Sequence, residues 1–372
     1  MNVALSDEQR ELSRTVRAFL EQKSPESDVR RLMETEEGFD RGVWAQMAVQ
    51  LGLQGLAIPE EHGGSGYTFR ELTIVLEEMG RVLLCAPFFS TAVLAASALL
   101  ESGDKEAQSR HLPGLASGET IATVALAEDT GGWNEAAVNL AATASNGAWK
   151  LSGTKSFVLD GHVADLILVA ARSPRGTSLF AVPGDAQGLA RQPLSTMDLT
   201  RKLARLEFDA VPAALVGAEG EAWPGIERTL QLAAVGLAAE QVGGAQRCLE
   251  MSVAYAQSRI QFGRPIGSFQ AVKHRCADML VQLEMAKSAA YYAGACAGSG
   301  DEDLPVAAAM AKSYCSEAYY KIASDTIQVH GGIGFTWEHP AHLYFKRAKS
   351  SELLLGDPRQ HRRQLAAALR LV

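Results

Sequence analysis

The segment "QVHGGIGF" (residues 328–335) places a histidine and three glycines directly after a stretch whose apolar spacing predicts a helix. Glycine in a helix interior costs about 0.5 to 1 kcal/mol relative to alanine, so Gly331, Gly332 and Gly334 are not expected there as ordinary helix residues. Either the backbone turns sharply at this segment, or another group comes very close to it. Taken alone, the segment is also compatible with a packed His330 beside a tight turn.

A second segment, "RIQFGRPIGSFQ" (residues 259–270), lies between two stretches with the spacing of long helices. The first helix is expected to end at Arg259, and Ser268 is placed to cap the next one. Arg259 and Arg264 flank an aromatic residue and a glycine, which suits a pyrophosphate with a ring nearby. The alternative is a helix–turn–helix connection with solvated arginines.

Composition narrows the classes of protein to consider. The chain has 372 residues, 47% hydrophobic and 21% charged, which is typical of a soluble globular protein with two or three domains. A formal net charge of −8 without a long Lys/Arg run argues against a nucleic-acid partner. The five cysteines form no CxxC pair, so we expect free thiols in a reducing cytoplasm and no metal site. No stretch approaches the roughly 18 apolar residues of a membrane span.

The hydrophobic pattern divides the chain into three parts. Helical spacing dominates residues 1–118, where Ser6 and Gln9 form a capping box. Short β-rich runs separated by turn residues fill 119–215 and predict a small antiparallel sandwich or barrel. Long helices return in 216–372 and predict a bundle. The expected fold is therefore multidomain α+β: an N-terminal helical domain, a central β-sandwich or barrel domain and a C-terminal four-helix bundle.

This organisation, with the two segments in tandem, resembles the flavin-dependent acyl-CoA dehydrogenases over essentially the whole chain. The resemblance implies removal of hydrogens from Cα and Cβ of an acyl-CoA thioester, with a base taking the α proton and FAD taking hydride. It also implies a tetramer with each FAD between two subunits, and electron-transfer flavoprotein as a possible acceptor. The residues that would reach the pyrophosphate and adenine of a flavin held mainly by the neighbouring subunit are Arg259, Phe262, Gln270, Gln328, Gly331 and Gly332.

The flavin-ring half of the site departs from the family pattern. The family usually has a Thr-Glu-Pro run ending in Gly-Ser-Asp, but "ALAEDTGGWN" has Ala127, Asp129 and Trp133 at the threonine, proline and serine positions. The family's tryptophan, threonine and asparagine after Gly-x-Lys appear in "GTKSFVLDG" as Phe157, Leu159 and Asp160. A leucine cannot hydrogen-bond a flavin nitrogen. Backbone amides in its place are the alternative, and Glu128, which survives from the run, receives no role.

The catalytic base departs as well. The two positions where the family carries its glutamate align with Leu355 and Ala233, both apolar. Glu240 lies on the apolar stripe of a helix, where a carboxylate must be paired, protonated or in a pocket. It is therefore a candidate substitute base with a raised pKa, or else a buried ion-pair partner or interface carboxylate. Lys346, Arg347 and Lys349 are expected on solvated helix faces, with CoA phosphates as the alternative ligand.

Intact elements for a neighbour's flavin, beside a degraded ring site, predict the partner subunit of a two-plus-two heterotetrameric acyl-CoA dehydrogenase. Such pairs resemble actinobacterial enzymes that act on steroid side-chain CoA esters. Three alternatives remain: a self-sufficient homotetramer that uses Glu240, a flavin oxidase on the same fold, and a scaffold subunit without flavin. A cytoplasmic protein without a membrane span is expected in each case.

Overall fold

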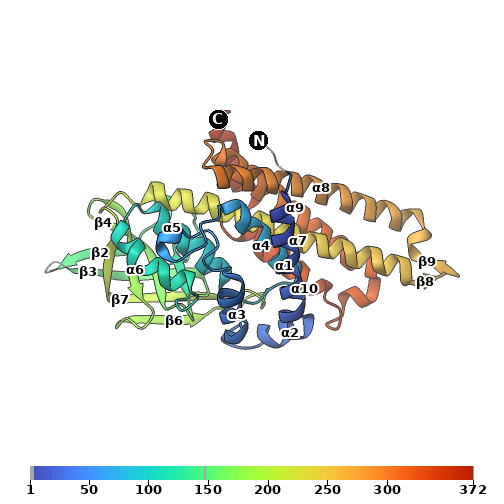
Figure 1. The fold of residues 1–372 in the computed structure, drawn as a ribbon, viewed down its shortest axis with the longest axis horizontal. Coiled ribbons are helices and arrows are strands. Elements are labelled where there is room, and N and C mark those ends of the chain that lie inside the picture. The colour runs from blue at the N-terminus through green and yellow to red at the C-terminus, as the bar shows by residue number, and fades with distance from the viewer. Residues whose placement is uncertain (1–3, 146–147, 372) are drawn as a thin grey trace. The chain divides into compact units, whose positions relative to one another are not determined.

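The computed structural model describes residues 4–145 and 148–371. The chain forms two compact units. The unit called here the helical unit comprises residues 1–30, 69–84 and 234–372, and the unit called the barrel unit comprises 31–68 and 85–233. The order of elements can be followed in Figure 1. The division into three domains at 118 and 215 stays a prediction.

The barrel unit is built around one sheet of seven strands. The strands are β1 (Ala122–Ala125), β2 (Ala141–Ser145), β3 (Ala148–Leu159), β4 (Leu166–Ser173), β5 (Gly176–Pro183), β6 (Leu189–Pro193) and β7 (Leu203–Val216). β4, β2, β3, β7 and β5 pair in turn, and β5 pairs with β4, which closes the ring. β1 adds to β4 and β6 adds to β7. A closed barrel leaves no free edge in that ring.

Three details of the sheet differ from the sequence expectation. Most strands pair antiparallel, as expected, but β1 and β2 each pair with β4 in parallel, so the sheet is mixed. The β-rich pattern predicts two separate runs, "AWKLSGT" and "KSFVL", but these form the single strand β3, with register shifts between Leu151 and Gly153 and between Lys155 and Val158. The sequence pattern does not predict β6, because "LARQP" lacks the alternation of apolar and polar residues that marks a half-buried strand. In the structure this strand is largely exposed.

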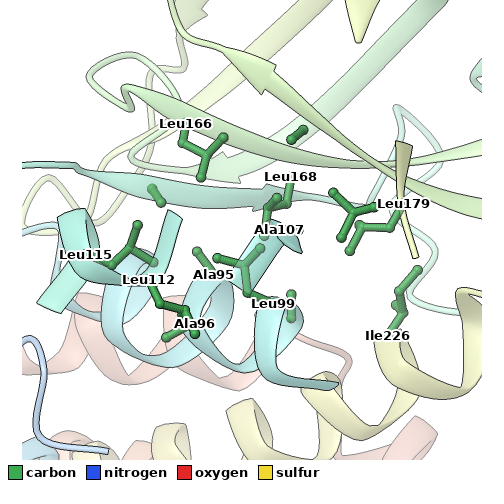
Figure 2. Close-up of a cluster of buried hydrophobic side chains, with 14 of the residues drawn as sticks. Ala95, Ala96, Leu99, Ala107, Leu112, Leu115, Leu166, Leu168, Leu179 and Ile226 are labelled. Carbon is green, nitrogen blue, oxygen red and sulfur yellow. The ribbon is translucent and has the colours of Figure 1, made fainter. Parts of the chain in front are cut away.

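Two hydrophobic clusters lie on opposite faces of the barrel wall. On β4, Ile167 and Val169 point to the interior with side chains from the other strands of the ring. Leu166 and Leu168 point outward, where helices cover them. Figure 2 shows this outer cluster between the strands and the helical segments η2 (Phe89–Ala95, a π-helix), α5 (Ala96–Glu101) and α6 (Lys105–Ala116). The unit also contains α3 (Arg41–Leu51), η1 (Glu60–His62) and η3 (Glu135–Ala137).

The helical unit combines segments from both ends of the chain. Its helices include α1 (Asp7–Lys23), α4 (Phe69–Arg81), α8 (Gln270–Ser299), α9 (Leu304–His330), α10 (Ala341–Leu353) and α11 (Pro358–Ala368). α2 (Glu26–Met33) and α7 (Trp223–Ser258) each run through both units. The capping box is confirmed: Gln9 N–H donates to Ser6 Oγ at 3.1 Å and Ser6 N–H donates to Gln9 Oε1 at 3.0 Å. No helix in the described part of the chain is long and apolar enough to cross a membrane.

Candidate cofactor and active site

The C-terminal half of α7 packs along α9 at successive levels. A Cβ at Gly244 would lie 2.4 Å from Tyr319 Oη, so only glycine lets the tyrosine ring come this close. Ser252 Oγ donates to Thr326 Oγ1 at 3.2 Å, and the Tyr255 ring stacks on the ring of His330 with 4.5 Å between centroids. The contacts advance in the same direction along both helices, so the helices are parallel and their C-terminal ends lie together. The segments 259–270 and 328–335, far apart in sequence, therefore meet.

A short hairpin follows α7. Arg259 N–H donates to Tyr255 O at 2.8 Å, and β8 (Ile260–Gln261) pairs with β9 (Arg264–Pro265) around a turn at Phe262 and Gly263. Phe262 is 90% exposed and has a φ of 52°, in the left-handed region that disfavours a bulky side chain. The hairpin projects beyond the ends of α7 and α8 (Figure 1). An exposed aromatic ring on a strained backbone position is typical of a functional contact.

The start of α8 corrects one expectation. Phe269 occupies the N-cap without a side-chain hydrogen bond, and Ser268 Oγ is buried with no hydrogen-bond partner among the described residues. Ser268 therefore does not cap the helix. The first N–H groups of α8 beside the exposed Gln270 have no side-chain acceptor, and such groups favour an anion. The Arg264 guanidinium lies 4.1 Å from the centre of the Phe269 ring, which orders this arginine.

The glycines after α9 serve different purposes. Gly331 has a φ of 61°, which explains glycine there by backbone conformation, and a Cβ at Gly334 would lie 2.8 Å from His330 Cβ and 2.9 Å from Ile327 O. Gly332, in the 3₁₀ segment η5 (Gly331–Phe335), has no positive φ, and a Cβ there would meet no heavy atom within 4 Å. Nothing in the described chain therefore requires glycine at 332. The exposed Gln328 lies on the last turn of α9.

Glu240 is buried on α7, as its place on the apolar stripe predicts, and it is paired. The Arg347 guanidinium on α10 donates to Glu240 Oε1 at 2.8 Å, and both side chains are almost fully buried. The expectation that Arg347 lies on a solvated face is therefore wrong. The geometry favours the ion-pair interpretation of Glu240, and its role as a base stays a prediction. A carboxyl group that sequence reasoning missed is Glu77 on α4, against Tyr291 Oη at 3.3 Å, where burial raises its pKa to about 7.

The positions expected around a flavin ring are packed into the barrel unit. Ala127 and Leu159 are buried, and Trp133 packs against the outer hydrophobic cluster. Trp133, Phe157 and Leu159 line a cavity of only about 20 Å³ together with apolar side chains of η2, α5 and the start of α7. Among these three positions no side chain offers a hydroxyl to a flavin.

Two acidic residues nearby have structural partners. Glu128 accepts hydrogen bonds from Lys155 Nζ at 2.9 Å and from the N–H groups of Asn139 and Leu140 at 2.7 and 2.8 Å, which ties the 128–140 segment to β3. Burial opposes ionisation of Glu128, but these hydrogen bonds outweigh it and lower its pKa. Burial lowers the pKa of Lys155 to about 8. Asp129 pairs with Arg205 at 3.2 Å and accepts a hydrogen bond from Ser156 Oγ.

The turn between α10 and α11 carries Leu355, at one of the family's two base positions. Leu355 is buried with a φ of 62°, and His361 Nε2 lies 3.0 Å from its carbonyl oxygen. The buried Lys312 Nζ donates to the carbonyls of Glu352 and Gly356 at 3.1 and 3.2 Å. Burial lowers the pKa of Lys312 to about 7 and that of His361 to about 4. The turn is thus held from two sides although it has no carboxylate at 355, and Ala233, at the other base position, is also buried and apolar.

With this architecture and these segments in place, family comparison identifies the class. The chain matches the acyl-CoA dehydrogenase N-terminal domain over residues 6–119, the middle domain over 123–211 and the C-terminal domain over 220–370. It therefore belongs to the acyl-CoA dehydrogenase family, whose members are FAD-dependent flavoprotein oxidoreductases. The expected arrangement of an N-terminal helical part, a central β part and a C-terminal helical part is confirmed.

Particular relatives are similar over nearly their whole length. Acyl-CoA dehydrogenase IpdE2 of Mycolicibacterium smegmatis is 37% identical over 363 residues, which cover 98% of this chain and 99% of the relative. A variant of the steroid acyl-CoA dehydrogenase Tcur3481–Tcur3483 superposes with a TM-score of 0.88 at 34% identity, with 98% of both chains covered. A chain of the ChsE4–ChsE5 complex from Mycobacterium tuberculosis gives a TM-score of 0.91 at 30% identity over 100% of both chains.

The residues of this chain fit the pyrophosphate and adenine of FAD better than its flavin ring. In the helical unit, Arg259, Phe262 and Gln270 are exposed beyond the end of α7, and the adjacent end of α9 leads into Gly332, where a Cβ would meet no heavy atom within 4 Å. This set suits a pyrophosphate and an adenine. In the barrel unit, Ala127, Trp133, Phe157 and Leu159 at the ring positions are apolar, and Asp129 is paired with Arg205.

Proposed function

We propose that this chain is the partner subunit of a heterotetrameric acyl-CoA dehydrogenase and contributes the pyrophosphate and adenine contacts to an FAD whose ring is held by the other kind of subunit. The observation that carries the proposal is the contrast between the two halves of the flavin site. Among residues 4–145 and 148–371, the side chains of Arg259, Gln270 and Gln328 have no hydrogen-bond partner and are exposed. At the ring positions, Ala127 and Leu159 are buried in apolar surroundings.

We call the residues proposed to contact the pyrophosphate and adenine the clamp: Arg259, Phe262, Gln270, Gln328, Gly331 and Gly332. Their groups have distinct physical tasks in this proposal. The Arg259 guanidinium offers paired N–H donors to the pyrophosphate, and the free N–H groups at the start of α8 add to them. Phe262 presents an apolar ring, and Gly332 leaves room for the cofactor near the backbone. Bound FAD supplies the hydride acceptor for α,β-desaturation of an acyl-CoA thioester, with electron-transfer flavoprotein as a candidate acceptor.

An assembly is supported by the surface of the helical unit. On α8, the apolar side chains of Leu280, Val281 and Met285 are 48%, 63% and 56% exposed, and Phe335 after α9 is 84% exposed. A cluster of exposed apolar side chains marks an interaction surface. The occupant we propose is a second acyl-CoA dehydrogenase chain, because similar solved structures carry paired names, ChsE4–ChsE5 and Tcur3481–Tcur3483. The description of the latter as a steroid enzyme supports a steroid-derived acyl-CoA as the substrate class.

The test is a flavin count on the tagged chain, purified alone and with the product of its neighbouring dehydrogenase gene. We expect the mixed assembly to contain about one FAD per two chains, and the chain alone to contain little. Arg259→Ala removes a charge-assisted contact of about 1.5 to 3 kcal/mol and should weaken FAD retention in the mixed assembly about ten- to a hundredfold. One FAD per chain, in the chain purified alone, would contradict the proposal.

The first alternative, a homotetramer that uses Glu240 as its base, predicts one FAD per chain in the chain purified alone. The second alternative is a scaffold subunit without flavin. It predicts a mixed assembly whose flavin content does not respond to Arg259→Ala. Flavin counts on the same preparations therefore distinguish the partner subunit, the homotetramer and the scaffold subunit.

A further inference from the structure

His330 forms the last contact between α7 and α9. Its ring lies between the Tyr255 ring, at 4.5 Å and 28°, and the His339 ring, at 4.2 Å and 46°. His330 Nδ1 lies 2.7 Å from Thr326 O, so this nitrogen carries the proton of the neutral ring. The side chain is buried, and burial lowers its pKa, although the hydrogen bond to the Thr326 carbonyl acts in the opposite sense.

The stack joins the two segments that make up the proposed clamp. Tyr255 lies one helical turn before Arg259 and accepts its N–H at 2.8 Å. His330 stands directly before Gly331 and Gly332, and its Cβ is the atom nearest to a Cβ built at Gly334. The Tyr255–His330 distance therefore sets the separation between the arginine at the end of α7 and the glycine turn at the end of α9.

Groups from several elements face the histidines on the other side of the stack. His339 Nδ1 accepts the N–H of Ala341 at 3.2 Å. Arg30 on α2 donates to the carbonyls of Trp337 and Glu338 at 2.7 and 3.2 Å, and so holds the loop before α10. Other titratable or charged groups near this cluster in the described part of the chain are Glu338, His342, Glu26 and Lys346. Burial lowers the pKa of both His339 and His342.

We propose that His330 is a positioning residue of the pyrophosphate clamp: its neutral ring, stacked between Tyr255 and His339, holds the end of α7 and the glycine turn at the separation that the cofactor requires. The proposal rests on the proposed function, because it assumes that Arg259 and Gly332 contact FAD. Protonation would place positive charge on rings 4.2 Å apart and loosen the stack.

The direction of the pH effect follows from linkage. In the closed clamp the pKa values of His330 and His339 are lowered, whereas in an open clamp they return to the ordinary histidine value. As pH falls, the open form therefore binds protons first and is favoured. FAD affinity should therefore be constant above the ordinary histidine pKa of about 6.5 and fall as pH drops below it.

The experiment measures FAD affinity of the mixed assembly by fluorescence titration after flavin removal, from pH 5.5 to 7.5. His330→Phe keeps a ring in the stack but cannot titrate at this position, so affinity at pH 7.5 should stay within about threefold of wild type. The fall at low pH should become clearly smaller, because only His339 still titrates in the stack. His330→Ala and Tyr255→Leu remove the stack and should weaken affinity about three- to tenfold at pH 7.5. His111→Gln changes a half-buried histidine on α6 in the barrel unit and should leave the wild-type profile unchanged.

A flat wild-type profile, or an unchanged fall in His330→Phe, would overturn the role of His330. Arg259→Ala separates this failure from a failure of the proposed function. If Arg259→Ala weakens affinity while the His330 and Tyr255 variants do not, the inference fails alone. If Arg259→Ala also has no effect, the clamp itself is refuted. Should His330→Ala not assemble, the comparison of wild type with His330→Phe decides the question.

Discussion

The sequence allows Glu240 to be a catalytic base or a paired buried carboxylate, and the structure favours the second interpretation. Its position on an apolar helix face requires compensation, and the compensating guanidinium belongs to Arg347, 107 residues later in the chain. The two meet where α4 crosses α7 so closely that a Cβ at Gly80 would lie 2.0 Å from Glu240 O. Breaking a buried pair leaves a buried charge uncompensated, which is costly. The structure therefore favours a stabilising role for Glu240.

Glu240→Gln tests that role directly. The change removes the carboxylate that pairs with the buried Arg347 and should lower the free energy of unfolding by about 3 kcal/mol, measured by urea denaturation. Glu317→Gln is the matched control, because Glu317 pairs with Arg362 at the same 2.8 Å but at the surface, where the loss should stay below about 1 kcal/mol. Turnover of the folded Glu240→Gln assembly should remain within a few-fold of wild type. A lost single-turnover flavin bleach with flavin retained would instead identify Glu240 as the base.

Gly332 offers a second test at a single position. Gly332→Val adds a side chain where the described chain has open space, so helical content and thermal stability should stay near wild type while FAD is lost. Gly334→Val is the control, because its Cβ would lie 2.8 Å from His330 Cβ and should destabilise the fold. Circular dichroism and flavin absorbance after dialysis measure the two effects. Retention of FAD by Gly332→Val would show that the glycine is not needed for the cofactor.

The hairpin between α7 and α8 combines local strain with exposure. Phe262 and Gly263 have φ values of 52° and 76°, the conformation of a turn that favours Asn-Gly. Phenylalanine at the first of these positions is unfavourable for the isolated chain, and among the described residues the ring of Phe262 makes one aromatic contact, an edge contact with Phe269 at 6.0 Å between centroids. We infer that the aromatic ring is retained for a contact outside this chain. The turn at Leu355 also has a strained backbone, with a φ of 62°, and hydrogen bonds to Lys312 and His361 hold it in place.

Phe262→Asn separates the two effects in the hairpin. Asparagine suits the left-handed conformation, so the variant should fold with unchanged or slightly higher stability. Loss of the aromatic contact should weaken FAD affinity of the mixed assembly about two- to tenfold, measured by titration. An unchanged affinity would mean that the ring does not contact the cofactor or its binding subunit.

The assembly as a whole depends on surfaces that a single chain leaves exposed. Leu280, Val281 and Met285 on α8 are 48%, 63% and 56% exposed, and the clamp residues Arg259, Phe262 and Gln270 are exposed on the same helical unit. Both features have an explanation if a second subunit covers them. The barrel unit is different, because its hydrophobic side chains fill the barrel interior and the contact with its own helices (Figure 2).

Met285→Glu introduces a charge into this apolar surface of α8. Because a buried unpaired carboxylate is costly, the variant should shift the assembly toward smaller species, measured by light scattering coupled to size-exclusion chromatography. Val49→Glu is the control: Val49 on α3 is 85% exposed and lies in the barrel unit, and the change should not alter the mass. An intact tetramer with Met285→Glu would exclude this part of α8 from the interface.

Local chemistry in the sequence was enough to predict the helical and β-rich parts, the Ser6 capping box and the two segments that mark the family. These depend on residue spacing within one turn or strand, which the chain order contains. The pairing of Glu240 with Arg347, the parallel strands beside β4 and the stack of Tyr255 on His330 depend on contacts between residues far apart in the chain. Only the packing of complete helices and strands decides such contacts, because burial and charge compensation are properties of the folded neighbourhood and not of the residue itself.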